Sequence, residues 1–290
     1  MSLKIYIVDV FAVAELTGNQ LAVVILKADL SPERMLSIAN EMNFSETVFI
    51  SPNKNSDGSY PIRIFTPSHE IDFAGHPLLG AAWTIKEYVE KSKIDNLALK
   101  LNRHLIPISF DRNTVWFESP KVSLGDKYSL FDISKGLNIP VDYLDTNLPI
   151  QKISAGISAL MIPIKNGNLL SSIEMSMVGF EWLKSNELPN LVYFFTSCAN
   201  SKDSDFSVRF FFESHGVRED SATGNGAALF GNYLMRNAKQ FKDNLQIRIE
   251  QGRNLNRPSM ILVKGQKKGI DTQVFVGGDV VPALDGSLLV

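Results

Sequence analysis

The sequence is poor in the residues that mark several classes of protein. It holds one cysteine, Cys198, and four histidines among 290 residues. A single thiol cannot form an internal disulfide or a cysteine-rich metal site, and it excludes any mechanism that needs two thiols. The cysteine content therefore favours a reducing compartment.

Neither sign of charge is in excess, since 29 Lys and Arg face 31 Asp and Glu for a net charge of −2. Proteins that bind nucleic acid usually carry a basic excess, which argues against such a partner. The apolar runs are strand-sized, well short of the roughly 18 residues of a membrane-spanning helix. No signal-peptide pattern follows Met1. We expect a cytoplasmic protein with no nucleic-acid or membrane partner.

What the sequence does contain is enough apolar material for a sizeable core, with 44% hydrophobic and 10% aromatic residues. At roughly 100–200 residues per domain, the length predicts two domains. We place the boundary just after Ser119-Pro120, which gives domains at 1–120 and 121–290, and the last strands can return to the first domain.

The pattern of apolar and turn residues predicts many short strands and few helices. One helix should begin at Ser31-Pro32-Glu33, where serine is a good N-cap and proline suits the first helical position. Two further helices are expected at 76–90 and 225–237. The stretch at 119–147 shows a looser pattern, without a clear helix or strand. The expected strands are 3–11, 20–26, 46–51, 60–66, 97–101, 105–110, 113–118, 150–154, 159–164, 191–197, 206–212, 245–250, 259–264 and 273–277.

One long-period repeat links the two halves at an offset of 146. Arg63-Ile64-Phe65 is echoed by Arg209-Phe210-Phe211, and Ser68-His69 by Ser214-His215. Each strand is followed by a polar loop, a glycine and a helix that opens with small residues. Gene duplication would give two similar domains that face each other; the alternative is chance similarity of two strand–loop–helix units.

Two glycine turns are candidate anion sites. Gly75-His76-Pro77 and Gly224-Asn225-Gly226 each open an expected helix. The unpaired amides and the dipole at a helix N-terminus favour an anion such as a substrate carboxylate. The alternative is that these glycines only allow tight strand-to-helix turns.

Three side chains are candidates for acid/base chemistry. Glu46 begins a strand on the same face as Val48, where partial burial would raise its pKa and suit it to proton transfer. Asp220 precedes the second glycine turn, and His76 follows Gly75. The structural alternatives are a solvated edge glutamate, a solvated loop acid and a helix-capping histidine.

Other motifs are missing or weak. The histidines show no metal-ligand spacing, and the sequence contains no P-loop, HExxH or GxGxxG motif. Cys198 reads as a strand-end thiol rather than a nucleophile. We expect neither a metal nor an organic cofactor.

Taken together, four segments resemble the PhzF family, named after the phenazine-biosynthesis isomerase, and their order and spacing span nearly the whole chain. The segments are Val8-Asp9-Val10-Phe11 with Gly18-Asn19-Gln20-Leu21-Ala22-Val23, Asn43-Phe44-Ser45-Glu46-Thr47, Phe65-Thr66-Pro67 through Phe73-Ala74-Gly75-His76-Pro77, and Glu219-Asp220-Ser221-Ala222-Thr223-Gly224-Asn225.

The resemblance implies an α+β fold like that of diaminopimelate epimerase. Such a fold has two similar domains related by a pseudo-twofold axis, each a curled mixed sheet around a central helix, with the site between them. The related epimerases use two cysteines, and the matching positions here are Ala74 and Thr223. A two-thiol racemase is therefore excluded.

The resemblance also implies roles for individual residues. Glu46 matches the glutamate that moves a proton in the phenazine enzyme, His76 and Asp220 match the family's histidine and second acid, and the glycine turns match Gly75 and Gly224. Ser221 and Asn225 depart from the family's usual proline and serine, which puts the substrate in question more than the chemistry.

The combined interpretation is a homodimeric, cofactor-independent isomerase that acts on a small carboxylate. Glu46, His76 and Asp220 would be catalytic, and substrate would contact Ser45, Gly75, Gly224, Asn225 and Gly226. One alternative is a cofactor-independent epimerase with bases other than cysteine. The other is a non-catalytic ligand-binding or interaction module on the same fold.

Overall fold

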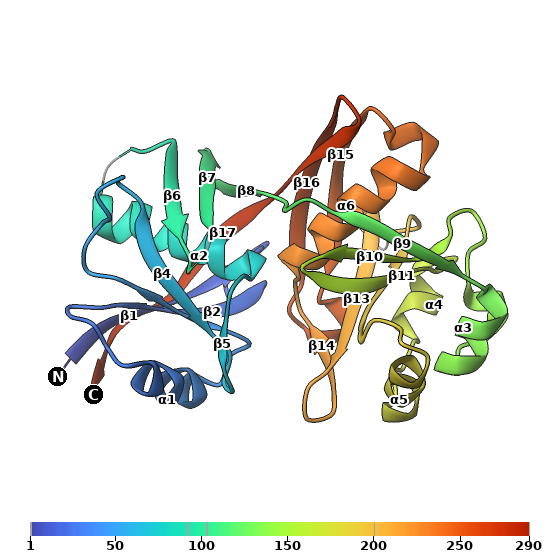
Figure 1. The fold of residues 1–290 in the computed structure, drawn as a ribbon, viewed down its shortest axis with the longest axis horizontal. Helices are drawn as coiled ribbons and strands as arrows, with labels where there is room; N and C mark the ends of the chain where they lie inside the picture. The colour runs from blue at the N-terminus through green and yellow to red at the C-terminus, as the bar shows by residue number, and fades with distance from the viewer. Residues whose placement is uncertain (1, 92, 103, 200, 290) are drawn as a thin grey trace. The chain divides into compact units, whose positions relative to one another are not determined.

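The computed structural model describes residues 2–91, 93–102, 104–199 and 201–289. The chain divides into two compact units (Figure 1). Unit 1 comprises Met1–Glu118 and Gly277–Val290, and unit 2 comprises Ser119–Val276. The C-terminal segment thus belongs to unit 1 although it follows unit 2 in the sequence.

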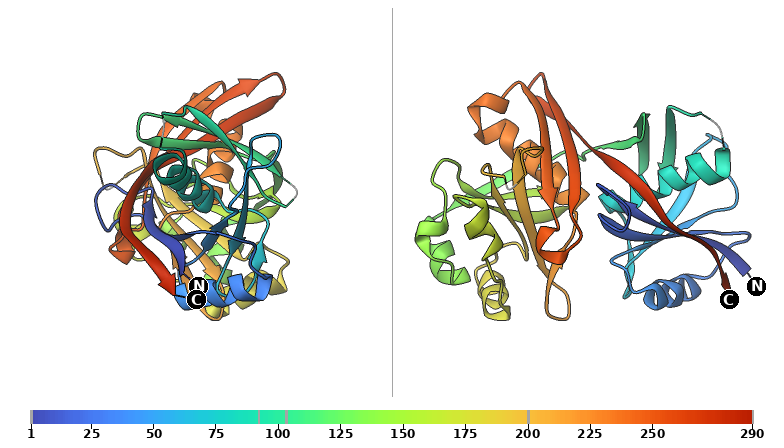
Figure 2. Two further views of the ribbon diagram at one scale, coloured as in Figure 1. Left: turned by 90° about the vertical axis from the view of Figure 1, so that its left-hand side faces the viewer. Right: turned by 180° about the vertical axis from the view of Figure 1, so that it is seen from behind.

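Unit 1 is a ring of mostly antiparallel strands in which β2–β3 and β4–β6 are parallel pairs. Neighbours pair as β1–β2, β2–β3 (parallel), β3–β4, β4–β6 (parallel), β6–β7 and β7–β8, and β17 pairs with both β8 and β1 to close the ring. Ser2 lies opposite Leu289, so the two chain ends lie together (Figure 2). The strands are β1 (Ser2–Val10), β2 (Asn19–Ile25), β3 (Thr47–Ile50), β4 (Tyr60–Phe65), β5 (Glu70–Ile71), β6 (Asn96–Lys100), β7 (Leu105–Asp111), β8 (Thr114–Glu118) and β17 (Asp271–Leu289). Strand β17 begins in unit 2 and enters unit 1 at Gly277.

Helix α2 (Gly75–Thr84) is the buried centre of this ring and contacts β1, β2, β3, β6 and β8. A Cβ on Gly80 would lie 2.4 Å from Leu21 Cδ2, so only glycine lets the helix approach β2 this closely. A π-helical turn, Ile85–Glu90, extends α2. Helix α1 (Pro32–Met42), which begins at the predicted Ser31 cap, covers the outer face of the sheet with Met35, Ile38 and Ala39.

Unit 2 repeats the same order of antiparallel and parallel pairs. Its pairs are β10–β11, β11–β12 (parallel), β12–β13, β13–β15 (parallel) and β15–β16, and β9 flanks β10. Helix α6 (Gly224–Asn237) packs on β10, β11, β15 and β16. The strands are β9 (Ser123–Tyr128), β10 (Ile150–Ala155), β11 (Ile157–Pro163), β12 (Leu191–Thr196), β13 (Phe206–Glu213), β14 (Val217–Asp220), β15 (Asn244–Gln251) and β16 (Ser259–Lys268).

The repeated sequence segments form equivalent elements. Arg63–Ala82 builds β4, β5 and the start of α2, and Arg209–Ala228 builds β13, β14 and the start of α6. The registers agree as well, since Phe65 lies opposite Glu70 and Phe211 opposite Glu219. The expectation of two similar α+β domains is therefore confirmed.

The looser stretch expected at 119–147 is wrong. It contains β9, α3 (Leu130–Leu137) and a 3₁₀ turn at Val141–Tyr143, and α4 (Gly167–Ser171) and α5 (Met177–Ser185) were also unexpected. These helices are too short to show a clear helical period, and they are stabilised by burial in one apolar cluster with β11, β12 and β13. Two further 3₁₀ turns lie at Lys239–Phe241 and Arg253–Leu255. In the described part of the chain, no helix is long and apolar enough to span a membrane.

Candidate active site

Glu46 and His76 meet inside unit 1. Glu46 directly precedes β3, and His76 is the second residue of α2. His76 Nε2 lies 3.3 Å from Glu46 Oε2, and the two side chains are 5% and 17% exposed. Asn43, which ends α1 in the left-handed conformation, turns the chain so that Glu46 enters the strand toward α2.

Burial keeps the imidazole of His76 neutral. It lowers the pKa of His76 from 6.5 to about 3, and a backbone hydrogen bond with Gln20 opposes this shift only in part. A backbone hydrogen bond that raises a histidine pKa is one that a ring N–H donates to a carbonyl. The other nitrogen of the neutral ring then carries a lone pair, and this nitrogen, Nε2, faces Glu46. This lone pair can accept a hydrogen bond but cannot donate one.

The N-terminus of α2 offers free backbone donors. Its N-cap, Ala74, has no side chain that caps the helix, and Pro77 has no N–H. The amides of Gly75 and His76 therefore point out of the first turn, where an anion is favoured. Ser45, next to Glu46, is exposed.

The remaining predicted site residues belong to unit 2. Asp220 ends β14 and is half-buried. Gly224 and Asn225 open α6, whose N-cap Thr223 accepts the N–H of Gly226 at 3.2 Å. The predicted role of Gly226 in substrate binding gains no support from this contact, because its amide is already occupied.

Gly226 instead has a packing role. A Cβ there would lie 2.5 Å from Thr223 Cγ2 and 2.8 Å from Tyr193 Cε2. Asn225 differs again, since its buried Oδ1 has no hydrogen-bond partner among the described residues.

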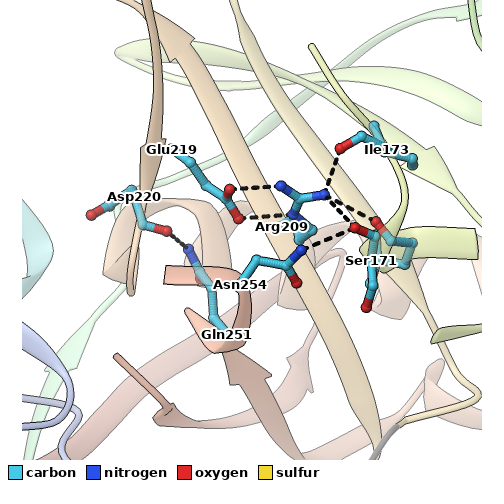
Figure 3. A network of polar contacts seen from close by, with 8 residues as sticks. Ser171, Ile173, Arg209, Glu219, Asp220, Gln251 and Asn254 are labelled. Atoms are coloured by element: carbon cyan, nitrogen blue, oxygen red, sulfur yellow. Dashed lines mark hydrogen bonds and ion pairs between the residues drawn. The ribbon is translucent and has the colours of Figure 1, made fainter. Parts of the chain in front are cut away.

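A polar network that the sequence did not indicate lies next to Asp220, around Arg209 and Glu219 (Figure 3). Arg209 donates to both carboxylate oxygens of Glu219, at 2.9 and 2.7 Å, and its third nitrogen donates to the carbonyls of Leu170, Ser171 and Ile173 at 3.3, 3.2 and 2.6 Å. The guanidinium thus connects β13 and β14 to the end of α4 and the residues that follow it. The repeat of Arg63 by Arg209 was the signal that could have drawn attention to it.

The counterpart of this ion pair in unit 1 is simpler. Arg63 donates to Glu70 at 2.7 and 2.6 Å, with the side chains 35% and 32% exposed. The same bidentate pair therefore joins the strand to its short partner in both units, but only Arg209 also binds backbone carbonyls.

The two acids occupy positions that the repeat does not relate. Phe65 and Phe211 are equivalent positions of the repeat. Thr47 lies opposite Phe65 on the neighbouring strand of unit 1, and Val192 lies opposite Phe211 in unit 2, so Thr47 corresponds to Val192. Glu46, one residue before Thr47, therefore corresponds to Leu191. Asp220 lies opposite Phe210 as Ile71 lies opposite Ile64, so Asp220 corresponds to Ile71. Each acid has an aliphatic counterpart in the other unit, so the repeat duplicates neither acid.

Other chemistry-bearing groups lie apart from these residues. Cys198 is a free, exposed thiol. Across the described residues, no three His, Cys, Asp or Glu side chains are grouped so that they could hold a metal ion.

The sequence matches the family described as PhzC-PhzF, phenazine biosynthesis-like protein, over residues 8–286. A trans-2,3-dihydro-3-hydroxyanthranilate isomerase from Pseudomonas fluorescens is 30% identical over 98% of both chains. The isomerase of the same name from Pseudomonas aeruginosa is 29% identical over 91% of this chain and 90% of the relative.

Solved structures agree with this assignment at the level of the fold. A PhzF-family phenazine biosynthesis protein from Bacillus anthracis superposes with a TM-score of 0.89 at 21% identity over 100% of both chains. A hydroxyproline epimerase from Agrobacterium vitis gives 0.66 at 10% identity over 99% of this chain and 91% of that one. These two structures show that the chain shares its fold with a PhzF-family protein and with a hydroxyproline epimerase. The chain belongs to the PhzF family, as the four sequence segments had indicated.

Proposed function

We propose that this protein is an isomerase that moves a proton on a small carboxylate substrate by general acid/base catalysis at Glu46. The observation that carries the proposal is the buried contact of 3.3 Å between Glu46 and a neutral His76. A carboxyl group next to a neutral imidazole can give its proton to the substrate and take one back while the imidazole itself stays uncharged.

The other residues would hold the substrate. His76 orients the carboxyl group of Glu46, and the amides of Gly75 and His76 attract the substrate carboxylate at the start of α2. The amides of Gly224 and Asn225 offer the same chemistry at the start of α6, and Asp220 is the second acid. This assignment needs neither a metal nor an organic cofactor.

The substrate class follows from the relatives by analogy. The two Pseudomonas relatives bear the name of an isomerase of trans-2,3-dihydro-3-hydroxyanthranilate, a small cyclic carboxylate. We propose a substrate of this chemical class and that compound as the first to test. Asn225, larger than the serine usual in the family, is expected to reshape the pocket around the carboxylate.

Two alternatives remain distinct in their chemistry. An epimerase would need two groups that exchange protons on opposite faces of one carbon. The two helix N-caps, which match the cysteines of the related epimerases, carry Ala74 and Thr223, so its bases would have to be other residues. A binding module would bind the ligand without exchanging its hydrogen. The homodimer and the cytoplasmic location stay predictions from the sequence.

The test is turnover of trans-2,3-dihydro-3-hydroxyanthranilate in D₂O, followed by NMR and repeated after dialysis against EDTA. We expect isomerisation with deuterium incorporated at the carbon that receives the proton, at an unchanged rate after EDTA. Binding without exchange would support the binding module, and replacement of hydrogen by deuterium at one carbon, with inversion at that same carbon, would support the epimerase.

A further inference from the structure

A buried glutamine, Gln251, joins both ends of the turn between β14 and α6. Its Nε2 donates to the carbonyl of Asp220 at 2.8 Å, and its Oε1 accepts the N–H of Thr223 at 3.2 Å. The residue is only 2% exposed, and Figure 3 shows its contact with Asp220. One side-chain amide therefore bridges the second acid of the proposed site and the N-cap of α6.

The backbone beside this glutamine is built for close approach to the same turn. Gly252 has a φ of +78°, and a Cβ there would lie 2.5 Å from the carbonyl oxygen of Ser221 and 2.2 Å from that of Arg257. Glycine is the residue type that suits this position, because it adopts a positive φ without strain and has no Cβ to collide with the two carbonyl oxygens. The end of β15 thus lies directly against the turn that Gln251 bridges.

The contacts continue from the bridge into the helix. Thr223, whose N–H is accepted by Gln251, uses its own Oγ1 to accept the N–H of Gly226. These two hydrogen bonds hold the residues on either side of Gly224 and Asn225, and they therefore restrict the orientation of the two intervening amides. On the other side, Arg209 fixes Glu219, the neighbour of Asp220, so that the acid is held at both flanks.

The fold itself does not require this amide. The strand pairing gives the equivalent residue in unit 1. Phe206 lies opposite Ile249, and its counterpart Tyr60 lies opposite Leu99. Two residues further along each strand, Gln251 therefore corresponds to Leu101. Leu101 is equally buried, at 2% exposed. Unit 1 builds the same strand–turn–helix with an apolar residue at this position, and the amide is found only in the unit that carries Asp220.

We propose that Gln251 is a positioning residue that sets the placement of Asp220 and of the α6 amides for the substrate. This inference rests on the proposed function. A misplacement of about 1 Å in a catalytic site can cost about 10²-fold in rate. Removal of the amide should therefore reduce turnover far more than it reduces the folded population.

The first test compares Gln251→Leu, which copies Leu101, with Gln266→Leu, which removes an exposed amide bonded to Gln273 on neighbouring strands. We expect Gln251→Leu to unfold cooperatively but to lose about 10²-fold in kcat/KM. Its affinity for 3-hydroxyanthranilate, which is aromatic and cannot undergo the proton shift, should fall at least tenfold. A folded Gln251→Leu whose kcat/KM and affinity stay within twofold of Gln266→Leu would overturn the proposal.

The second variant, Gln251→Glu, covers the case in which the leucine variant does not fold. A protonated glutamic acid reproduces the donor and acceptor of the glutamine, whereas a carboxylate cannot donate to the Asp220 carbonyl. The ratio of variant to wild-type affinity for 3-hydroxyanthranilate should therefore rise toward one as the pH falls. Asp220, Glu219, Arg209 and the Glu250–Arg253 pair are the ionisable groups near this position; they are common to both proteins and influence the pH at which the new carboxyl group titrates. A ratio independent of pH would contradict the positioning role.

A measurement that needs no substrate separates this inference from the proposed function. Hydrogen exchange at the Thr223 and Gly226 amides should be at least tenfold faster in Gln251→Leu than in Gln266→Leu. If the wild-type protein neither binds nor converts the probes, the proposed function fails, and this exchange alone decides the positioning. Unchanged exchange at both amides would refute it.

Discussion

His76 and Glu46 face each other across 3.3 Å in the interior of unit 1, with the imidazole kept neutral by its burial. The contact depends on the fold, because His76 lies in the first turn of the central helix α2 and Glu46 directly precedes β3 in the surrounding sheet. The helix brings a proton acceptor to a carboxyl group that water reaches only in part. This is the environment in which a carboxyl group can serve as both acid and base.

The burial of His76 should make the stability of unit 1 depend on pH. The pKa of His76 is about 3 in the folded protein and 6.5 as the ordinary value. The unfolded chain therefore binds the proton first, and stability falls as the pH is lowered from 6.5 to about 3, by up to about 1.4 kcal/mol per pH unit.

His76→Asn should remove this contribution, which can be measured as urea midpoints of the variant and wild type across this range. The exposed His69, replaced by Asn, is the control in the same unit. Parallel curves for His76→Asn and wild type would contradict the account.

The two matched arginines should differ in their importance for stability. Arg209→Met leaves the buried carboxylate of Glu219 and several carbonyls without their partner, which typically costs about 3–5 kcal/mol. Arg63→Met breaks a half-exposed pair, with an expected cost of about 0–1 kcal/mol. Urea unfolding of both variants tests this difference, and equal losses would show that the carbonyl contacts of Arg209 add nothing.

A pair of glycines within helices should respond in opposite ways to alanine. Gly226→Ala should destabilise the protein by about 1–3 kcal/mol, because the new Cβ would lie 2.8 Å from the ring of Tyr193. At Gly179 of α5 the nearest atoms to a Cβ are 3.6 Å away, so alanine should stabilise by about 0.5–1 kcal/mol through helix propensity. Thermal unfolding measures both changes, and stabilisation by Gly226→Ala would disprove the packing role.

The single cysteine should be dispensable. Cys198 is exposed, so Cys198→Ser should change the free energy of unfolding by less than about 0.5 kcal/mol and leave turnover unchanged. In the native wild-type protein a thiol reagent should titrate this group fully. A large loss of activity on substitution would assign the thiol a role that the present account denies it.

Local pattern was sufficient for the elements that repeat. The helices at α1, α2 and α6 and the predicted strands are confirmed within a few residues, except the last strand, because their apolar spacing is a strong local signal. The strand predicted at 273–277 continues to Leu289 as β17, and the strands β5, β9 and β14 were not predicted. Helices α3 and α5 were missed, since they are short and depend on contacts far apart in sequence. Gly136 of α3, for example, packs against the ring of Trp182 in α5, where a Cβ would lie 2.2 Å from the ring.

The sequence also led to the pair of Glu46 and His76, through the position of the acid at a strand start and of the histidine in a glycine turn. It could not lead to Gln251, whose partner Asp220 is 31 residues away. Nor could it show that Arg209 binds carbonyls some 36 to 39 residues earlier, because such contacts depend on the tertiary fold.

The most direct test of the proposed chemistry is the turnover of Glu46→Gln in D₂O. The amide keeps the shape and hydrogen-bonding reach of the carboxyl group but cannot carry the proton. With trans-2,3-dihydro-3-hydroxyanthranilate as substrate, we expect kcat to fall by about 10²–10⁴-fold, KM to change little and deuterium incorporation to fall in parallel. Glu41→Gln, an exposed glutamate of α1, is the control and should match the wild type. A Glu46→Gln enzyme that retains most of its rate and deuterium incorporation would contradict the assignment of Glu46 as the proton carrier.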